Sequence, residues 1–247
     1  DAPVYFDFEG TAVQKTSHEI TWTAELAEKG GFDHFTLKEI FEQPQALRDT
    51  MIGRIHPESP IQLDDIKVTK EELMQLNRIY IVACGTAYHA GLVGKKAIEM
   101  LTRIPVDVEV SSEFRYGDPI IDEKSLVIVI SQSGETADTL AVLKESQARG
   151  ARVLAVTNVV GSSIARDADD VFYTWAGPEI GVASTKAYLT QLVAMYTLGL
   201  HFAELLGVQS SIDPKELKQG LLDLPLLVEE TLLLADEIKT YAQSMYM

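Results

Sequence analysis

A short polar stretch without a basic residue follows an apolar run near the middle of the chain. Residues 131–136 read SQSGET and come directly after LVIVI, a run typical of a strand buried on both faces. The side chains here that can donate hydrogen bonds are those of Ser131, Gln132, Ser133 and Thr136. If a helix starts at this point, its unpaired backbone N–H groups and its partial positive charge add to these donors. The stretch therefore predicts a site for a small, doubly charged oxyanion such as phosphate.

Helix capping is the simpler explanation of the same residues. A cap needs a single Ser or Thr, so it accounts for Thr136 and leaves the other donors unexplained. The stretch matches neither G-x-G-x-x-G nor the Walker pattern, which weighs against a nucleotide ligand. We therefore favour the phosphate hypothesis.

Two further polar turns lie between a predicted strand and a predicted helix. They are CGTAYHAG at residues 84–91 and GVASTKAY at residues 181–188. Taken alone, the first is nearly as well explained as an ordinary strand-to-helix turn. Cys84 is expected to be a packed thiol rather than a nucleophile, because no basic group lies beside it in the sequence.

The elements that position these turns follow from the apolar pattern. Predicted strands cover residues 79–84, 106–110, 126–131, 152–157 and 170–175, and the clearest helices cover 86–101, 136–149 and 185–206. Strands that alternate with helices predict an α/β fold, a three-layer αβα sandwich around a five-stranded parallel sheet. Ligands of such sheets bind beyond the carboxyl ends of the strands, so the three turns are predicted to share one rim.

The two ends of the chain differ from this core. Residues 1–33 are predicted to be the tail of a preceding domain and a linker, and residues 34–247 a second domain with helices at both ends. Thr36 and Glu39 suggest a capping box, and Pro44 suggests a helix start. Asp213, with Pro214 behind it, predicts another helix start, and an amphipathic helix is expected beyond Pro225. Its Leu-rich stripe is expected to be core or subunit contact.

Composition narrows the classes of function. The chain has 247 residues and a net charge of −16, which argues against nucleic acid and against an anionic membrane surface. A single cysteine, Cys84, rules out an intrachain disulfide and a multi-cysteine metal site. No stretch is judged to approach the ~20 apolar residues that span a bilayer. We expect a cytoplasmic protein, and the missing initiator Met suggests a piece of a longer chain.

The order of four segments resembles a known family. CGTAYHAG, SEFRYGDP, SQSGETADTLAVL and EIGVASTKAYLTQ are similar to the sugar isomerase (SIS) domain of the glutamine–fructose-6-phosphate aminotransferases. EITWTAELAEKGGFDHFTLKEIFEQPQALRDTMIGRI resembles that family's linker after its glutaminase domain. The resemblance implies a SIS-type sheet of flavodoxin-like strand order, no cofactor, and a homo-oligomer.

The resemblance also implies a substrate and its contacts. Members of the family convert fructose 6-phosphate to glucosamine 6-phosphate with ammonia from glutamine. By motif, the residues expected to bind the phosphate are Ser131, Gln132, Ser133 and Thr136. The residues expected to contact the rest of the sugar are Thr86, Ala87, Val182 and Ser184. Ala87 stands where the family often has Ser, which removes one hydroxyl donor.

The resemblance implies that the catalytic residues lie elsewhere. In the family they belong to a second SIS domain and to the glutaminase domain, and we expect neither to be complete in this chain. Lys186 and the five histidines, His18, His34, His56, His89 and His201, match no catalytic motif of the family. His89 is expected to be packed or hydrogen-bonded to its helix.

Two other functions stay open at this point. SIS domains also serve as sugar-phosphate sensors attached to DNA-binding helices, although the acidic charge and the linker speak against this. A stand-alone phosphosugar isomerase would need a general base, and Glu135 is the only carboxylate in the right neighbourhood. We expect its side chain to point outward or to tie down the loop.

Overall fold

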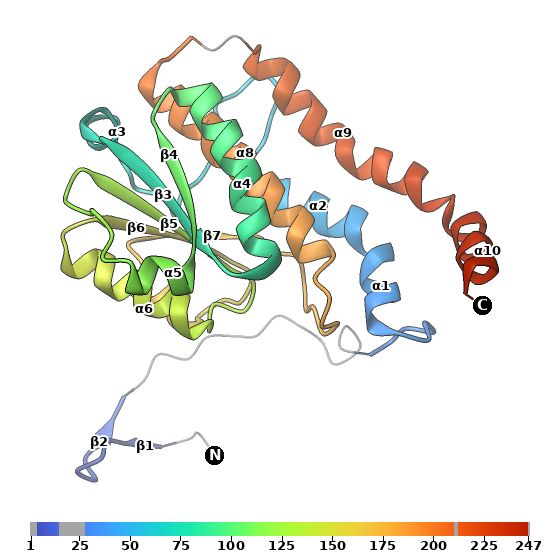
Figure 1. Ribbon diagram of the computed structural model, residues 1–247, viewed down its shortest axis with the longest axis horizontal. Coiled ribbons are helices and arrows are strands. Elements are labelled where there is room, and N and C mark those ends of the chain that lie inside the picture. Colours follow the sequence, from blue (N-terminus) through green and yellow to red (C-terminus); the bar gives the residue numbers. More distant parts are fainter. Residues whose placement is uncertain (1–3, 15–27, 210–211, 247) are drawn as a thin grey trace.

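A five-stranded parallel sheet forms the centre of the computed structural model (Figure 1). The structure describes residues 4–14, 28–209 and 212–246, so the predicted linker stretch EITWT and His18 lie outside the described residues. The strands are β3 (Arg78–Ala83), β4 (Val106–Val110), β5 (Ser125–Ser131), β6 (Arg152–Thr157) and β7 (Asp170–Tyr173). Their spatial order is β4-β3-β5-β6-β7, all parallel. Counted along the chain this is 2-1-3-4-5, which confirms the predicted flavodoxin-like order.

Alternate residues of each strand enter two separate cores. Ile79, Ile81, Leu126, Ile128, Ile130, Leu154 and Val156 belong to one core. Tyr80, Val82, Val127, Val129, Val153 and Ala155 belong to the other. Because both faces of the sheet are covered, the central strands are apolar at nearly every position, which is why they stand out in the sequence.

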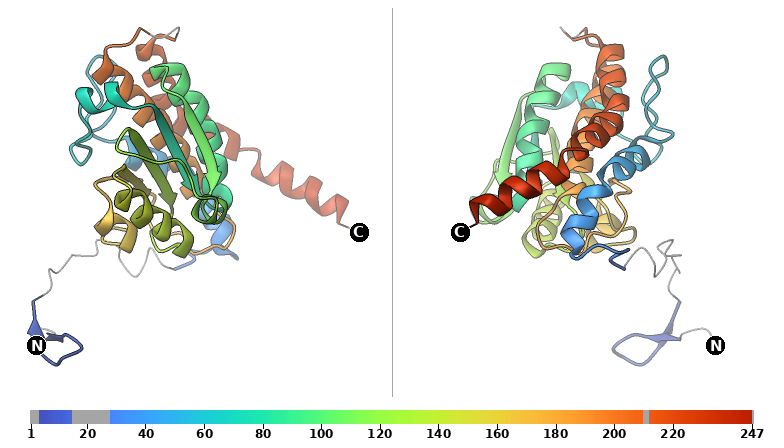
Figure 2. Two further views of the ribbon diagram at one scale, coloured as in Figure 1. Left: turned by 60° about the vertical axis from the view of Figure 1, so that its left-hand side comes forward. Right: turned by 90° about the vertical axis from the view of Figure 1, so that its right-hand side faces the viewer.

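Helices cover the two faces and complete the three layers (Figure 2). The second core is closed by α5 (Ser111–Tyr116), α6 (Ala137–Ala148) and α7 (Ser163–Asp167). The first core is closed by α2 (Gln43–Met51), α3 (Lys70–Gln75), α4 (Gly85–Thr102), α8 (Lys186–Leu206) and α9 (Pro214–Leu232). The predicted αβα sandwich is confirmed.

Helices α4 and α8 run side by side in the same direction (Figure 1). A Cβ added at Gly94 would lie 2.6 Å from Met195 Sδ, and one added at Gly199 would lie 3.6 Å from Ile98 Cα. Each of these residues lies about the same number of turns into its own helix. The two helices therefore start together, at the carboxyl edge of the sheet.

Helix α8 corrects one sequence expectation. By length and composition alone it is apolar enough to cross a membrane, whereas no stretch was expected to approach this limit. Its most apolar window is 61% buried inside the protein, as in the core helix of a globular domain. The polar residues Thr190 and Gln191 interrupt its apolar pattern, yet they too are buried.

The ends of the helices bring further corrections. Helix α1 (Phe35–Phe41) follows His34, so Thr36 lies inside the helix and the predicted capping box of Thr36 and Glu39 is wrong. A capping box that the sequence analysis missed joins Thr69 and Glu72 at the start of α3. Asp213 caps α9 as predicted, through Lys215 N.

The C-terminal and N-terminal segments complete the description. Pro225 lies inside α9, and the helix expected beyond it is present as the rest of α9 followed by α10 (Ala235–Met245). Near the N-terminus, β1 (Tyr5–Phe6) and β2 (Ala12–Val13) form a two-stranded antiparallel sheet of their own.

Two glycines on helices offer a matched stability test. A Cβ at Gly91 of α4 would lie 2.9 Å from Ile81 and 3.1 Å from Val108, both branched side chains of the sheet. Gly220 of α9 has no atom within 4 Å of that position. We predict that Gly91→Ala lowers the free energy of unfolding by ~1–3 kcal/mol through overpacking. Gly220→Ala should raise it by about 0.5–1 kcal/mol. Urea unfolding measures both, and equal effects would contradict the close packing of α4 on the sheet.

Candidate functional site

The three polar turns meet at the carboxyl edge of the sheet. β3 and β5 are neighbours, and they lead directly into residues 84–91 (the first turn) and 131–136 (the second turn). The strand order reverses between these two strands, which is where ligands of open α/β sheets bind. The parallel start of α4 and α8 brings residues 181–188 (the third turn) beside the first turn. The edge therefore gathers the N-termini of α4, α6 and α8.

The second turn is closed by its own hydroxyl groups. Ser131 Oγ lies 2.9 Å from Thr136 Oγ1 and accepts a hydrogen bond from Gly134 N (3.1 Å). Thr136 occupies the N-cap position of α6 but its side chain makes no capping bond. Capping therefore does not explain this residue. Ser133 is exposed, and its Oγ accepts from Glu135 N (3.2 Å).

The start of α7 holds the second turn in place. Ile164 N donates to Gly134 O (3.0 Å), and Ser163 N donates to Glu135 Oε1 (2.7 Å). Gly134 has a φ of 67°, and an added Cβ would overlap Ser162 Oγ. The glycine is required both for its backbone conformation and for this close approach.

Asn158 joins the second turn to the loop after β7. Its backbone N donates to Gln132 O (3.1 Å). Its side-chain Nδ2 donates to Gly177 O (2.7 Å), while Oδ1 accepts from Ala176 N (2.8 Å) and Thr174 Oγ1 (3.1 Å). The residue is 2% exposed, so these bonds are shielded from water. The backbone and side chain of one buried residue thus link two loops of the rim.

The third turn is organised by Glu179. Its Oε1 accepts from Thr185 N (2.9 Å) and Ala187 N (3.2 Å), and its Oε2 accepts from Ser184 Oγ (3.1 Å). The carboxylate therefore satisfies first-turn N–H groups of α8 that have no partner within the helix. Val182, in the same turn, is fully exposed.

The first turn contributes backbone more than side chains. Cys84 is half-buried at the N-cap of α4, so the expected packed thiol is only partly enclosed. Gly85 has a φ of 60°, Thr86 is exposed, and Ala87 is buried. Of the predicted contacts here, only the Thr86 hydroxyl offers a side-chain donor.

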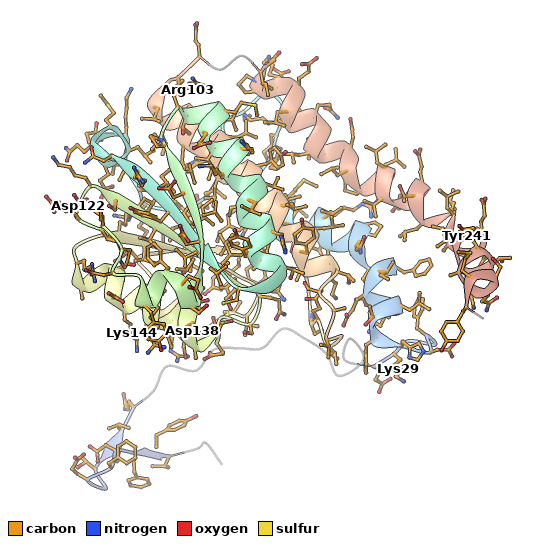
Figure 3. The ribbon with its side chains drawn as sticks, viewed as in Figure 1. Lys29, Arg103, Asp122, Asp138, Lys144 and Tyr241 are labelled. Carbon is orange, nitrogen blue, oxygen red and sulfur yellow. The ribbon has the colours of Figure 1, made fainter. Side chains whose placement is uncertain are left out.

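Charged groups near the rim are already engaged. The hydrogen bond from Ser163 N lowers the pKa of Glu135, and this carboxylate ties the loop down, as expected. Lys186 is 2% exposed and its Nζ lies 2.6 Å from Glu42 Oε2. Asp138 in the first turn of α6 (Figure 3) pairs with Arg115 at 3.0 Å.

The histidines offer no alternative. His89 is exposed beside the Tyr88 ring instead of packed, which corrects the expectation for it. His34 and His56 are exposed. His201 is half-buried in α8, and burial lowers its pKa. Within the part of the chain that the structure describes, no group of three His, Cys, Asp or Glu side chains forms a metal site.

Comparison with known proteins identifies this arrangement. The SIS domain family matches residues 72–201, more than half of the chain. The chain belongs to the SIS domain family. The match contains the first and second turns, all five strands of the sheet and most of α8, so the SIS domain includes the whole candidate edge.

The SIS domain has relatives of known name. The chain is 62% identical over 242 residues to the glutamine–fructose-6-phosphate aminotransferase [isomerizing] of Clostridium perfringens, covering 98% of this chain and 40% of that protein. It is 57% identical to the enzyme of the same name from Clostridium tetani, covering 100% of this chain and 41% of that protein. The chain thus spans about two fifths of the length of these relatives.

Solved structures agree on the fold of the SIS domain. The C-terminal domain of glucosamine-fructose-6-phosphate aminotransferase from Francisella tularensis aligns with a TM-score of 0.80 and 41% identity, over 87% of this chain and 60% of that one. Glucosamine-6-phosphate deaminase from Thermotoga maritima aligns with a TM-score of 0.59 and 19% identity, over 78% and 54% of the two chains. The second likeness shows the fold alone.

The sequence analysis missed the roles of three residues that organise the rim: Asn158, Glu179 and Glu39. Asn158 follows a predicted strand, and Asn is common in turns. The only sequence signal for its role was its position at the carboxyl end of that strand. Glu179 precedes the third turn by two residues, and an acceptor before a helix start was a usable signal. Glu39 accepts from residues 141 and 142 positions away, which no local pattern shows.

We predict that Asn158→Ala destabilises the SIS domain. The change leaves the buried Ala176 N and Thr174 hydroxyl, and the partly buried Gly177 O, without their side-chain partner. Each buried unsatisfied group costs roughly 1–3 kcal/mol. Urea unfolding measures the loss. The control is Asn77→Ala, an exposed Asn at the opposite edge, which should unfold like the unchanged chain. An equally small effect of both changes would contradict the bridging role of Asn158.

Proposed function

We propose that this chain is the sugar-phosphate-binding part of an enzyme that makes glucosamine 6-phosphate from fructose 6-phosphate and glutamine-derived ammonia. The observation that carries the proposal is the convergence of three helix N-termini, with a donor-rich turn among them, on one edge of a SIS domain. The names of the most similar relatives support the substrate and the reaction. No cofactor is part of this proposal.

The phosphate is assigned to the second turn. Ser131, Gln132, Ser133 and Thr136 surround the start of α6, whose first N–H groups have no acceptor within the helix. Since the turn is braced by the start of α7, its donors are held in place before the ligand arrives. Such preorganisation lowers the ordering cost of binding.

The remainder of the sugar is assigned to the first and third turns. Thr86 and Ala87 face the ligand from the start of α4, and the backbone near Val182 and the hydroxyl of Ser184 meet sugar hydroxyls from the other side. Ala87 contributes only its backbone. The loss of one hydroxyl donor at this position reduces the number of possible contacts by one.

Catalytic groups are proposed to come from outside this chain. Isomerisation beside a carbonyl needs a base, and imine formation needs an unprotonated lysine. The lowered pKa of Glu135 and its bond to Ser163 N make it a poor base, which disfavours a stand-alone isomerase. Lys186 is held by Glu42 as an ion pair. A second SIS domain and a glutaminase domain are the proposed partners in the complete protein.

The domain division and assembly belong to the same proposal. Residues 1–33 would be the end of the glutaminase domain and its linker, and residues 34–247 the first SIS domain. Helices α9 and α10 expose Leu226, Leu227, Leu233, Leu234, Ile238, Tyr241 and Met245 (Tyr241 is labelled in Figure 3). This apolar surface supports a homo-oligomer or contact with a further domain. We place the enzyme in the cytoplasm.

We predict that Ser133→Ala weakens binding of fructose 6-phosphate by about tenfold or more, because a hydrogen bond to a charged group contributes ~1.5–3 kcal/mol. Calorimetric titration measures the affinity. The control is Ser59→Ala. Ser59 is exposed and lies two residues before Ile61, whose N donates to Glu204 in the C-terminal half of α8, away from the carboxyl edge of the sheet. Unchanged affinity in the Ser133 variant would remove the second turn from the site.

We also predict that this chain binds fructose 6-phosphate without converting it. A positioned base contributes roughly 100- to 10,000-fold, so turnover with added ammonia should stay near background. Chromatographic detection of glucosamine 6-phosphate is the measurement. Robust product would contradict the assignment, and its loss in Glu135→Gln or Lys186→Ala would then identify the responsible residue.

A further inference from the structure

Glu39 is a buried carboxylate whose partners lie on the third turn. It is 1% exposed. Its Oε1 accepts from Ile180 N at 2.6 Å and from Gly181 N at 3.0 Å, and its Oε2 lies 3.2 Å from Gly181 N. A buried charge is stable only where it is paired or hydrogen-bonded, and bonds to an ionised acceptor are the stronger kind. Helix α1 thus grips the backbone at the beginning of the turn.

A second contact, from Glu42 directly after α1, holds the other end of the turn. Glu42 Oε2 lies 2.6 Å from Nζ of Lys186, the first residue of α8, and Lys38 lies 3.5 Å from the same carboxylate. The segment 180–186 is therefore held at one end by Glu39 of α1 and at the other by Glu42, the residue after α1. Val182 and Ala183, which lie between these two contacts, are exposed. The position of this part of the backbone therefore depends on the contacts at its two ends.

The contact at Gly181 leaves no spare room. A Cβ at this position would lie 2.6 Å from Glu39 Oε2, 2.7 Å from Thr36 Oγ1 and 3.3 Å from Thr36 Cα. The last of these atoms is backbone and can move only with the helix. The position of the third turn at the edge of the sheet therefore depends on α1 as well as on Glu179. Helix α1 lies outside the matched residues 72–201.

We propose that Glu39 is a positioning residue for sugar recognition. Its carboxylate holds residues 180–184 in the position where Val182 and Ser184 meet the sugar hydroxyls, although Glu39 itself touches no ligand. This inference rests on the proposed function, because it assigns the third turn to the sugar and the second turn to the phosphate. It extends the site to an element whose sequence shows only a helix start.

The test separates the two halves of the ligand. Calorimetric titrations with fructose 6-phosphate and with inorganic phosphate are run on the unchanged chain and on Glu39→Gln, which keeps size and one acceptor but loses the charge. We expect about tenfold weaker binding of fructose 6-phosphate and a less than twofold change for phosphate. Glu71→Gln, an exposed Glu on α3, is the matched control and should match the unchanged chain for both ligands.

The outcomes distinguish the two proposals. If the unchanged chain fails to bind fructose 6-phosphate, the proposed function itself is wrong. If the unchanged chain binds it and Glu39→Gln binds it equally well, or loses both ligands equally, the positioning role alone is wrong. Gly181→Ala perturbs the same contact from the other side, and it replaces Glu39→Gln if that variant does not fold.

A spectroscopic measurement reports on the contact without a ligand. In protein labelled with ¹⁵N-glycine, the Gly181 amide proton should move upfield in Glu39→Gln, because its hydrogen bond to a charged acceptor is lost. The Gly134 and Gly85 amides should stay in place. Movement of all three would indicate a general loosening of the edge and would overturn the specific role of Glu39.

Discussion

Asn158 joins two loops at an edge where strand pairing alone does not fix their positions. Strand pairing fixes where β5, β6 and β7 end, but it does not fix the loops that follow them. Asn158 uses its backbone N–H on Gln132 and its side-chain amide on Gly177, Ala176 and Thr174. Because the amide is buried, breaking any one of these bonds leaves a polar group without water. The geometry of the second turn therefore depends on a residue that contributes no group to its surface.

The acidic charge of the chain has to be reconciled with the anionic ligand that we propose for this edge. The chain carries a net charge of −16, yet the carboxylates around the rim are turned to structural use. Glu135, Glu179 and Glu39 each accept backbone N–H groups of a loop. Such bonds stabilise the loops, and the N–H dipoles partly offset the negative charge of each carboxylate. The helix N-termini at this edge carry a partial positive charge, which at α8 is offset by the Glu179 carboxylate.

The sequence predicted the elements with strong local patterns and missed those that depend on distant contacts. The five strands and the donor-rich second turn were predicted, because burial on both faces and clustered hydroxyls are visible in a few consecutive residues. The strand order was implied by the family resemblance. The predicted Thr36–Glu39 capping box was wrong, because the Glu39 carboxylate instead accepts a hydrogen bond from Gly181 N. The helix expected beyond Pro225 is present, as the second half of α9 followed by α10. The binding roles of the site residues stay predictions.

The position of Cys84 has a practical meaning. It is the single cysteine of the chain, it is half-buried, and it lies at the start of α4 beside the first turn. A thiol-directed fluorophore or spin label would therefore attach at one site only, next to the groups assigned to the sugar. The protein carries a built-in attachment point for an optical or magnetic probe of its own binding edge, and no residue has to be replaced to use it.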